Sequence, residues 1–200
     1  LLFGGWAAAQ DEPMRSLISH WAQGVRIDSS VVVTTADGTR LATTVMRPWW
    51  KLGPLPTILI RTPYGRHGMG RGWARRGYAV VVQDMRGRHD SSGVFQPYTH
   101  DTADGTTTID WIVAQPWSNG RVGSIGCSST GESQWPMIGS QHPALRATIP
   151  ASSGAAIGEI PGNDTQGAIY RGGIPLIGLW AWWYGDMAIT ERLMPPPNST

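Results

Sequence analysis

The chain of 200 residues contains a single cysteine, Cys127, and few charged residues. One cysteine cannot form an internal disulfide, and it excludes a cysteine-rich metal site within this sequence. Asp, Glu, Lys and Arg make up only 15% of the residues, and the formal net charge is +2. The arginines are scattered and form no basic stripe, which argues against a nucleic-acid or membrane-surface partner. No apolar run reaches the ~20 residues that a membrane-spanning helix requires.

The remaining composition is that of a globular chain, with 40% hydrophobic and 9% aromatic residues. The first nine residues, "LLFGGWAAA", pass from apolar residues into three alanines and then into a polar stretch. This pattern resembles the end of a secretory signal with its A-x-A cleavage site, and it predicts a secreted or periplasmic protein. A frayed terminus of a cytosolic protein is the alternative.

Between residues 31 and 153, short apolar strands alternate with helical segments. Two β-branched runs flank Asp37-Gly38, a pair that accepts the positive φ angles of a type I′ turn, which predicts a hairpin over 31–48. Buried strands are expected at 55–65, 78–88, 120–127 and 145–153, and helices at 70–77, 101–116 and 129–143. Such alternation favours parallel pairing through right-handed crossovers. The sequence therefore predicts an α/β fold with a mostly parallel sheet and an N-terminal antiparallel hairpin.

The stretch "SIGCSSTG" follows the expected strand at 120–127 and opens a helix. Ligands of such sheets bind at the carboxyl ends of the strands. Gly126 and Gly131 bracket Ser128 in the pattern G-x-S-x-x-G, as in a nucleophile elbow, where a tight strand-to-helix turn requires small neighbours of the serine. Ser129 is the alternative candidate for the nucleophile, but Cys127 would then stand at the position of the elbow pattern that calls for glycine. Cys127 lies on the strand side of the bend and is expected to be a small buried hydrophobe.

Several blocks in this order resemble the cocaine esterase and X-Pro dipeptidyl-peptidase-like branch of the α/β-hydrolases, which includes α-amino-acid ester hydrolases and glutaryl acylases. The blocks are "TTADGTRLATTVMRP", "PTILIRTPYG", "GYAVVVQDMRGRHDSSGVF", "DWIVAQPWSNGRVGSIGCSSTGESQW" and "HPALRATIPASS". The resemblance implies a serine hydrolase that cleaves ester, amide or X-Pro-type peptide bonds of small substrates through an acyl-enzyme, without metal or organic cofactor. It identifies Ser128 as the nucleophile, and Tyr64 and the backbone N–H of Ser129 as the oxyanion hole.

The resemblance also implies a domain layout. Residues 10–153 would form the N-terminal part of the hydrolase domain, and residues 154–200 the beginning of a helical cap. A serine nucleophile needs a histidine base and an orienting carboxylate, which follow it in this chain order. Only His142 follows Ser128, and it is expected to be a capping or surface residue. The resemblance implies that the acid and the histidine lie beyond residue 200, so that this N-terminal fragment would be nearly inactive alone.

Two positions, Ser129 and Pro136, depart from the family's pattern. Family members commonly carry an aromatic residue where Ser129 stands, so the pocket wall loses a ring. Pro136 falls inside the helix expected at 129–143, where proline costs about 3 kcal/mol or kinks the helix.

Asp84, at a strand end, could be a catalytic carboxylate; we favour a structural role in which it and Arg86 hold loops under the elbow by charge-assisted hydrogen bonds.

Two other functions fit parts of the sequence. "GMGRGWARRG" at 68–77 suggests a nucleotide-binding loop, but it reads G-x-G-x-G rather than G-x-G-x-x-G and lies far from the preceding strand. The Trp-rich "LWAWWYG" at 179–185 suggests a contact surface of a non-catalytic interaction protein.

Overall fold

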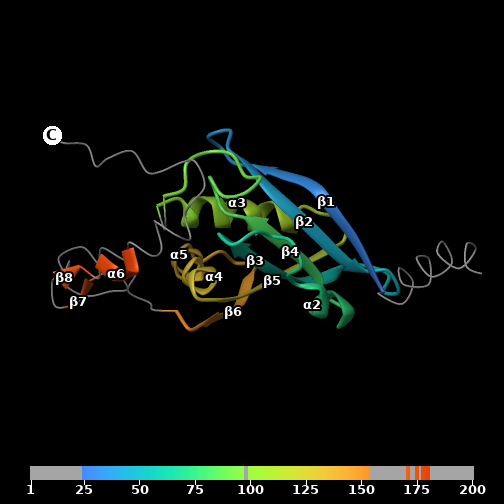
Figure 1. The fold of residues 1–200 in the computed structure, drawn as a ribbon. Coiled ribbons are helices and arrows are strands. Elements are labelled where there is room, and N and C mark those ends of the chain that lie inside the picture. Colours follow the sequence, from blue (N-terminus) through green and yellow to red (C-terminus); the bar gives the residue numbers. More distant parts are fainter. Residues whose placement is uncertain (1–23, 97–98, 154–169, 172–173, 176, 181–200) are drawn as a thin grey trace, which may run out of the picture.

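The computed structural model describes residues 24–96, 99–153, 170–171, 174–175 and 177–180 (Figure 1). The predicted signal remnant at 1–9 and most of the predicted cap at 154–200, including most of the Trp-rich stretch, lie outside the described residues. Within the described part of the chain, no helix is long and apolar enough to span a membrane.

A sheet of six strands forms the centre of the fold, in the order β1-β2-β4-β3-β5-β6. The neighbours from β4 to β6 pair in parallel, whereas β1 with β2 and β2 with β4 pair antiparallel. This confirms the predicted mostly parallel sheet with an N-terminal antiparallel hairpin. The strands are β1 (Val25–Thr34), β2 (Arg40–Pro48), β3 (Leu55–Thr62), β4 (Ala79–Asp84), β5 (Ser118–Cys127) and β6 (Leu145–Ala151). Farther along the chain lie β7 (Tyr170–Arg171), β8 (Ile174–Pro175) and α6 (Ile177–Trp180).

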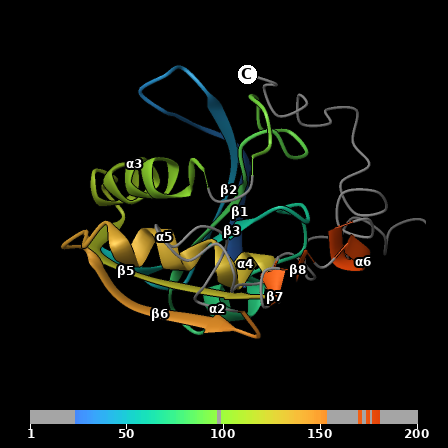
Figure 2. The ribbon, with the colours of Figure 1, turned by 90° about the vertical axis from the view of Figure 1, so that its left-hand side faces the viewer.

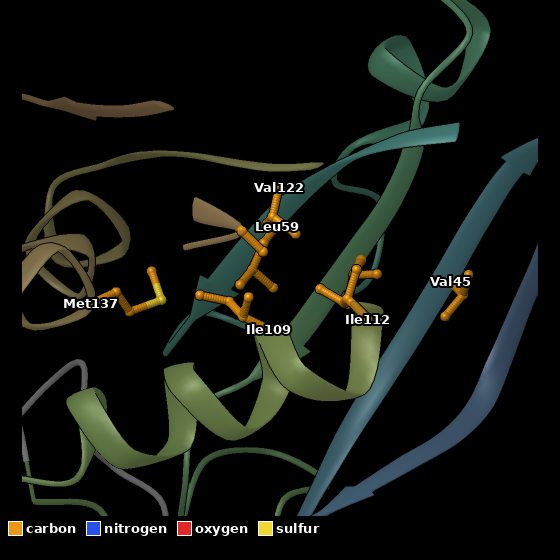
Figure 3. Packing of buried hydrophobic residues seen from close by; sticks show 8 residues of the cluster. Val45, Leu59, Ile109, Ile112, Val122 and Met137 are labelled. Atoms are coloured by element: carbon orange, nitrogen blue, oxygen red, sulfur yellow. The ribbon is translucent and has the colours of Figure 1, made fainter. Parts of the chain in front are cut away.

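One face of the sheet packs against α3 (Asp101–Val113) and α5 (Gln134–Gly139) (Figure 2). Leu59 of β3 is completely buried there against Ile109 of α3 (Figure 3). Burial of one such side chain contributes about 1.5–3 kcal/mol. The buried members of this cluster are Val45, Leu59, Val81, Ile109, Ile112, Val122, Met137 and Ala144.

The opposite face packs against α2 (Arg71–Arg75). Successive residues of a strand point to opposite faces, so Ile60 and Val82 join Ala74 of α2 in a second cluster, one position along from Leu59 and Val81. Both faces of β3 and β4 are thus covered, which explains their continuous apolar sequences. The carboxyl ends of these strands are held in place by packing from both sides.

The turn between β1 and β2 differs from the prediction. Gly38 has φ +83°, but Asp37 keeps a negative φ, so the expected type I′ turn is wrong. The N–H of Gly38 donates to the carbonyl of Thr35 at 2.9 Å, as in a type I turn followed by a left-handed glycine. The Asp37 carboxylate accepts hydrogen bonds from the Thr35 hydroxyl and the Thr39 N–H. These local bonds stabilise the negative φ at Asp37.

The prediction of a single helix at 129–143 is also wrong, because this segment forms two helices. They are the short helices α4 (Ser129–Glu132) and α5, with Ser133 between them. Pro136 is the third residue of α5 and therefore lies in its first turn, where the N–H that proline lacks would have no intrahelical partner. The break before α5 accommodates the proline.

Candidate active site

Ser128 occupies a sharp bend between β5 and α4. Its backbone has φ +57° and ψ −133°, a region that residues other than glycine rarely adopt, at a cost of about 1–3 kcal/mol. Backbone hydrogen bonds hold this conformation. The Ser128 N–H donates to the carbonyl of Ala151 at 3.0 Å, and the Ser128 carbonyl accepts from Gly131 and Glu132 at 2.7 and 2.8 Å. The side chain of Ser128 is exposed at the bend.

The glycines around Ser128 are required by close backbone contacts. A Cβ atom at Gly126 would lie 2.3 Å from the carbonyl oxygen of Thr130, and one at Gly131 would lie 2.9 Å from that of Ala151. Both distances are shorter than real Cβ contacts, and both partners are backbone atoms that cannot move away cheaply. The G-x-S-x-x-G pattern thus has a steric origin, since only glycine allows β5, α4 and β6 to approach this closely.

The side chain of Tyr64 reaches the same point from the end of β3. Its hydroxyl donates to Ser128 Oγ at 3.2 Å, and its oxygen accepts the backbone N–H of Ser129 at 3.4 Å. The three residues singled out by the sequence lie together, although Tyr64 and Ser128 are 64 positions apart. The arrangement places the Ser128 hydroxyl beside one phenolic and one backbone amide group, and none of these three residues carries a charged side chain.

The turn after β4 lies beside Tyr64 and is rich in buried ion pairs. Asp84 is completely buried, and its Oδ2 contacts Arg66 Nη1 at 2.5 Å. Arg66 also pairs with Asp90 at 2.6 Å, and its hydrogen bond holds the pKa of the Asp90 carboxyl below the ordinary value. These contacts agree with a structural role of Asp84, with Arg66 as its partner.

Arg86, which the sequence grouped with Asp84, connects two more distant segments. Its guanidinium contacts Asp104 of α3 and Asp37 of the β1–β2 turn, both at 2.6 Å. These hydrogen bonds, the one that Arg86 donates to Asp104 first, raise the pKa of Arg86, and burial opposes the rise. Arg86 therefore ties the turn after β4 to a helix and to the hairpin.

Three of the described histidines, His89, His100 and His142, make hydrogen bonds with groups other than Ser128. In the part of the chain that the structure describes, none of the hydrogen bonds of Ser128 involves a histidine. His142 contacts Asp110 of α3 through Nε2 at 3.0 Å and accepts the N–H of Ala144 at Nδ1. His100 contacts Gln96. His89 contacts the carbonyl of Pro63, one residue before Tyr64.

Cys127 is exposed, and the expectation of a buried hydrophobe is wrong. It is the last residue of β5, and its partner across the strand pair, Ala151, is exposed as well. Position at the strand end, rather than the apolar character of the thiol, decides its exposure.

Sequence reasoning missed the side chains that surround the turn bearing Tyr64. Thr62 Oγ1 accepts the Tyr64 N–H at 3.1 Å and a hydrogen bond from the Thr130 hydroxyl at 3.3 Å. Arg88 donates to the carbonyl of Pro63 at 2.9 Å. The parallel pairing of β3 with β4 brings "RTPYG" and "RGRHD" to one edge of the sheet, and this adjacency is the signal that could have revealed the contacts.

Packing explains the central glycine of "GMGRG", Gly70. A Cβ atom at Gly70, which has φ +81°, would lie 2.6 Å from Val80 Cγ1 of β4. Gly70 therefore allows the approach of α2 to the sheet, and a nucleotide-binding loop is not needed to account for it.

Comparison with known proteins identifies hydrolases. The family model described as X-Pro dipeptidyl-peptidase (S15 family) matches residues 37–197. Cocaine esterase from Rhodococcus sp. is 35% identical over 175 residues, which cover 83% of this chain and 30% of that protein. A CocE/NonD family hydrolase from Staphylococcus aureus has a similar structure, with a TM-score of 0.57 and 28% identity over 62% of this chain and 27% of its own.

An α-amino acid ester hydrolase shares the fold, with a TM-score of 0.65 and 24% identity over 82% of this chain and 30% of its own. The fold is thus that of an α/β-hydrolase, as predicted. The chain spans about 30% of the length of the cocaine esterase that it matches. The family model covers most of this chain, including the described bend at Ser128, and the chain belongs to the X-Pro dipeptidyl-peptidase family of hydrolases.

Proposed function

We propose that the bend at Ser128 and the turn at Tyr64 form the nucleophile and oxyanion hole of a serine hydrolase. The main support for this proposal is the hydrogen bond that the Tyr64 hydroxyl donates to Ser128 Oγ. The backbone nitrogen of Ser129 lies 3.4 Å from the oxygen of the same hydroxyl. The exposure of Ser128 gives a substrate access to its hydroxyl.

In the proposed reaction, Ser128 Oγ forms a bond to the carbonyl carbon of an ester or amide, and the carbonyl oxygen gains negative charge. The phenolic O–H of Tyr64 and the N–H of Ser129 stabilise this charge. The bond to the alcohol or amine then breaks, and the serine proton passes through a base to the leaving group. Water releases the acyl group by the reverse sequence and restores the serine.

The proposal assigns the base and its orienting carboxylate to a part of the protein outside residues 1–200. The chain covers about 30% of the length of cocaine esterase, which supports this assignment. A serine without its base reacts slowly, so residues 1–200 alone should hydrolyse esters poorly. Ester, amide and X-Pro-type peptide bonds share the acyl-enzyme route, and all three remain within the proposed substrate class.

The nucleophile is tested by labelling the natural full-length protein with a fluorophosphonate and locating the adduct by peptide mass spectrometry. We expect the adduct on Ser128 and its loss in Ser128→Ala. Ser129→Ala removes the rival hydroxyl but keeps the backbone N–H, so this variant should still be labelled at Ser128. An adduct on Ser129 or on Cys127 would refute the assignment.

The oxyanion hole is tested by Tyr64→Phe, which removes one donor and keeps the ring. Loss of one such donor costs about 2.7–4 kcal/mol of transition-state stabilisation, or about 10²–10³ in kcat. A kcat close to that of the parent protein would exclude Tyr64 from the oxyanion hole without affecting the assignment of Ser128.

A further inference from the structure

The carbonyl of Pro63 accepts hydrogen bonds from two neighbouring side chains. Arg88 donates through Nε at 2.9 Å, and the His89 Nε2 lies at 3.1 Å from the same oxygen. Both residues come from the turn after β4, whereas Pro63 directly follows β3. A single backbone carbonyl is thus held by two side chains of the adjacent turn.

The same peptide unit is also held through its N–H. The Tyr64 N–H donates to Thr62 Oγ1, which in turn accepts from Thr130 of α4. Both polar groups of the peptide between Pro63 and Tyr64 therefore have partners. Because this peptide plane leads directly into the Cα of Tyr64, its orientation sets the direction in which the phenol leaves the backbone.

The geometry fixes the state of the His89 ring. A carbonyl oxygen only accepts hydrogen bonds, so Nε2 must carry the proton in this contact. His89 adopts φ +46°, and a Cβ atom at Gly65 would lie 3.2 Å from the ring of His89. Gly65, directly after Tyr64, has φ +100°. The ring thus packs closely against the turn that carries the phenol.

We propose that His89, together with Arg88, is a positioning residue for the oxyanion hole. Its hydrogen bond to the Pro63 carbonyl keeps the Tyr64 hydroxyl within reach of Ser128 and of the Ser129 N–H. The inference rests on the proposed function, because it assumes that the phenol stabilises an oxyanion. His89 acts only through Tyr64 and takes no part in proton transfer.

Two amide variants of different reach test this role. The amide nitrogen of Gln can occupy the place of Nε2, whereas that of Asn is too short for the Pro63 carbonyl. Asn and Gln are both compatible with a positive φ; Gln141 of this chain has φ +52°. His89→Asn therefore removes the contact and keeps the backbone conformation, and His89→Gln restores the donor. His142→Asn, which changes a histidine that contacts α3, is the matched control.

The assay measures kcat and KM of the full-length protein with p-nitrophenyl acetate. A misplacement of 1 Å costs up to about 10²-fold in rate. We expect His89→Asn to lower kcat roughly tenfold with KM nearly unchanged, since a small shift of one donor costs part of that factor. His89→Gln should recover most of this loss, and His142→Asn should leave kcat unchanged.

The decisive measurement repeats His89→Asn in the Tyr64→Phe background. If His89 acts through the phenolic hydroxyl, the second substitution has no further effect once that hydroxyl is absent. An equal loss of kcat in both backgrounds would overturn the proposal, as would equal losses for His89→Asn and His89→Gln. Failure of the proposed function is distinguishable, because Ser128→Ala would then retain activity whatever the His89 variants do.

A purely structural role of His89 would give a different result. The urea midpoint of unfolding of each variant shows whether stability has changed. If His89→Asn fails to fold, Arg88→Lys provides a second test, because lysine keeps the charge but has no Nε–H at the position of the guanidinium. A fall in stability with kcat unchanged, in whichever of these variants folds, would also overturn the positioning role.

Discussion

The turns after β4 and β5 lie at the same edge of the sheet and differ in almost every physical respect. The end of β4 and the turn after it carry Asp84, Arg86 and Arg88, all nearly completely buried. The turn after β5 carries no charge from Cys127 to Gly131, and its central residue, Ser128, is exposed and has a positive φ. In this protein the charged strand end provides position, and the uncharged strand end provides the group proposed to react.

The difference follows from the cost of burying charge. An ionised side chain away from water needs partners, and each partner fixes two segments relative to each other. Arg66 joins Asp84 to Asp90, and Arg86 joins the hairpin to α3. A hydroxyl that must meet a substrate cannot be enclosed in this way, and no ion pair holds the bend at Ser128, which is stabilised by backbone hydrogen bonds and close backbone contacts. Substitutions in the turn after β5 should therefore lower activity as well as stability, whereas substitutions of the buried ion pairs near the end of β4 should lower stability alone.

The largest effect is expected for Gly126→Ala, which places a Cβ atom against the carbonyl of Thr130. Overpacking of this kind costs about 3 kcal/mol, and the shift of the bend should lower kcat at least about 10²-fold. Gly123→Ala is the matched control on the same strand, because its nearest atoms would lie at 3.6 Å, an ordinary contact distance. Urea unfolding and ester hydrolysis are measured on both variants.

If Gly126→Ala and Gly123→Ala lose activity and stability equally, the close approach of β5 and α4 does not control the bend. The proposed difference between the turn after β5, held by backbone contacts, and the turn after β4, held by ion pairs, would then be contradicted. The comparison is sharpened if Gly126→Ala loses fluorophosphonate labelling at temperatures where it remains folded.

Asp84→Asn is expected to lower stability about as much as Gly126→Ala but to leave the reactivity of Ser128 unchanged. Removing one partner of a buried ion pair costs 3–5 kcal/mol, and because Asp90 still contacts Arg66, we expect about 3 kcal/mol. Labelling of Ser128 should continue at the parent rate below the unfolding temperature. Asp110→Asn removes a carboxylate that is 69% exposed and should cost less than about 1 kcal/mol. Loss of labelling in folded Asp84→Asn would assign Asp84 to the chemistry instead.

The sequence predicted the elements of the fold and the location of the bend because these depend on local patterns. Continuous apolar runs identified β3 and β4, which are covered on both faces, and the glycine spacing around Ser128 identified the sharp bend there. The contact of Tyr64 with Ser128 came from the family resemblance, since no local pattern joins residues 64 positions apart. The parallel pairing of β3 with β5 brings the two strand ends together and makes this contact possible.

The errors occurred where distant or irregular contacts override local preference. Asp37 keeps a negative φ in an irregular turn, because its carboxylate accepts hydrogen bonds from the Thr35 hydroxyl and the Thr39 N–H. The helix after Ser128 is broken before Pro136, which then fits a first turn. Arg88 and His89 could not be assigned from the sequence, because their partner is a backbone carbonyl that any residue at position 63 would supply.

The smallest expected effect is on the pH dependence of stability, and it concerns the ion pair between Asp37 and Arg86 of the turn after β4. The hydrogen bond from Arg86, and next that from Thr35, holds the pKa of the Asp37 carboxyl below its ordinary value. The lowered pKa in the folded state means that the unfolded chain binds the proton first as the pH falls. The contribution of Asp37 to stability is therefore complete above about pH 5 and is lost as the pH falls through about 4 and below. Because 54% of the Asp37 side chain is exposed, water screens the pair and the loss is small. Asp37→Asn should flatten the decrease of the urea midpoint between pH 6 and pH 3 relative to the parent protein. Ser128→Ala leaves Asp37 and its ion pair unchanged and should follow the parent curve. Equal slopes for Asp37→Asn and the parent protein would show that the ion pair between Asp37 and Arg86 does not stabilise the folded state.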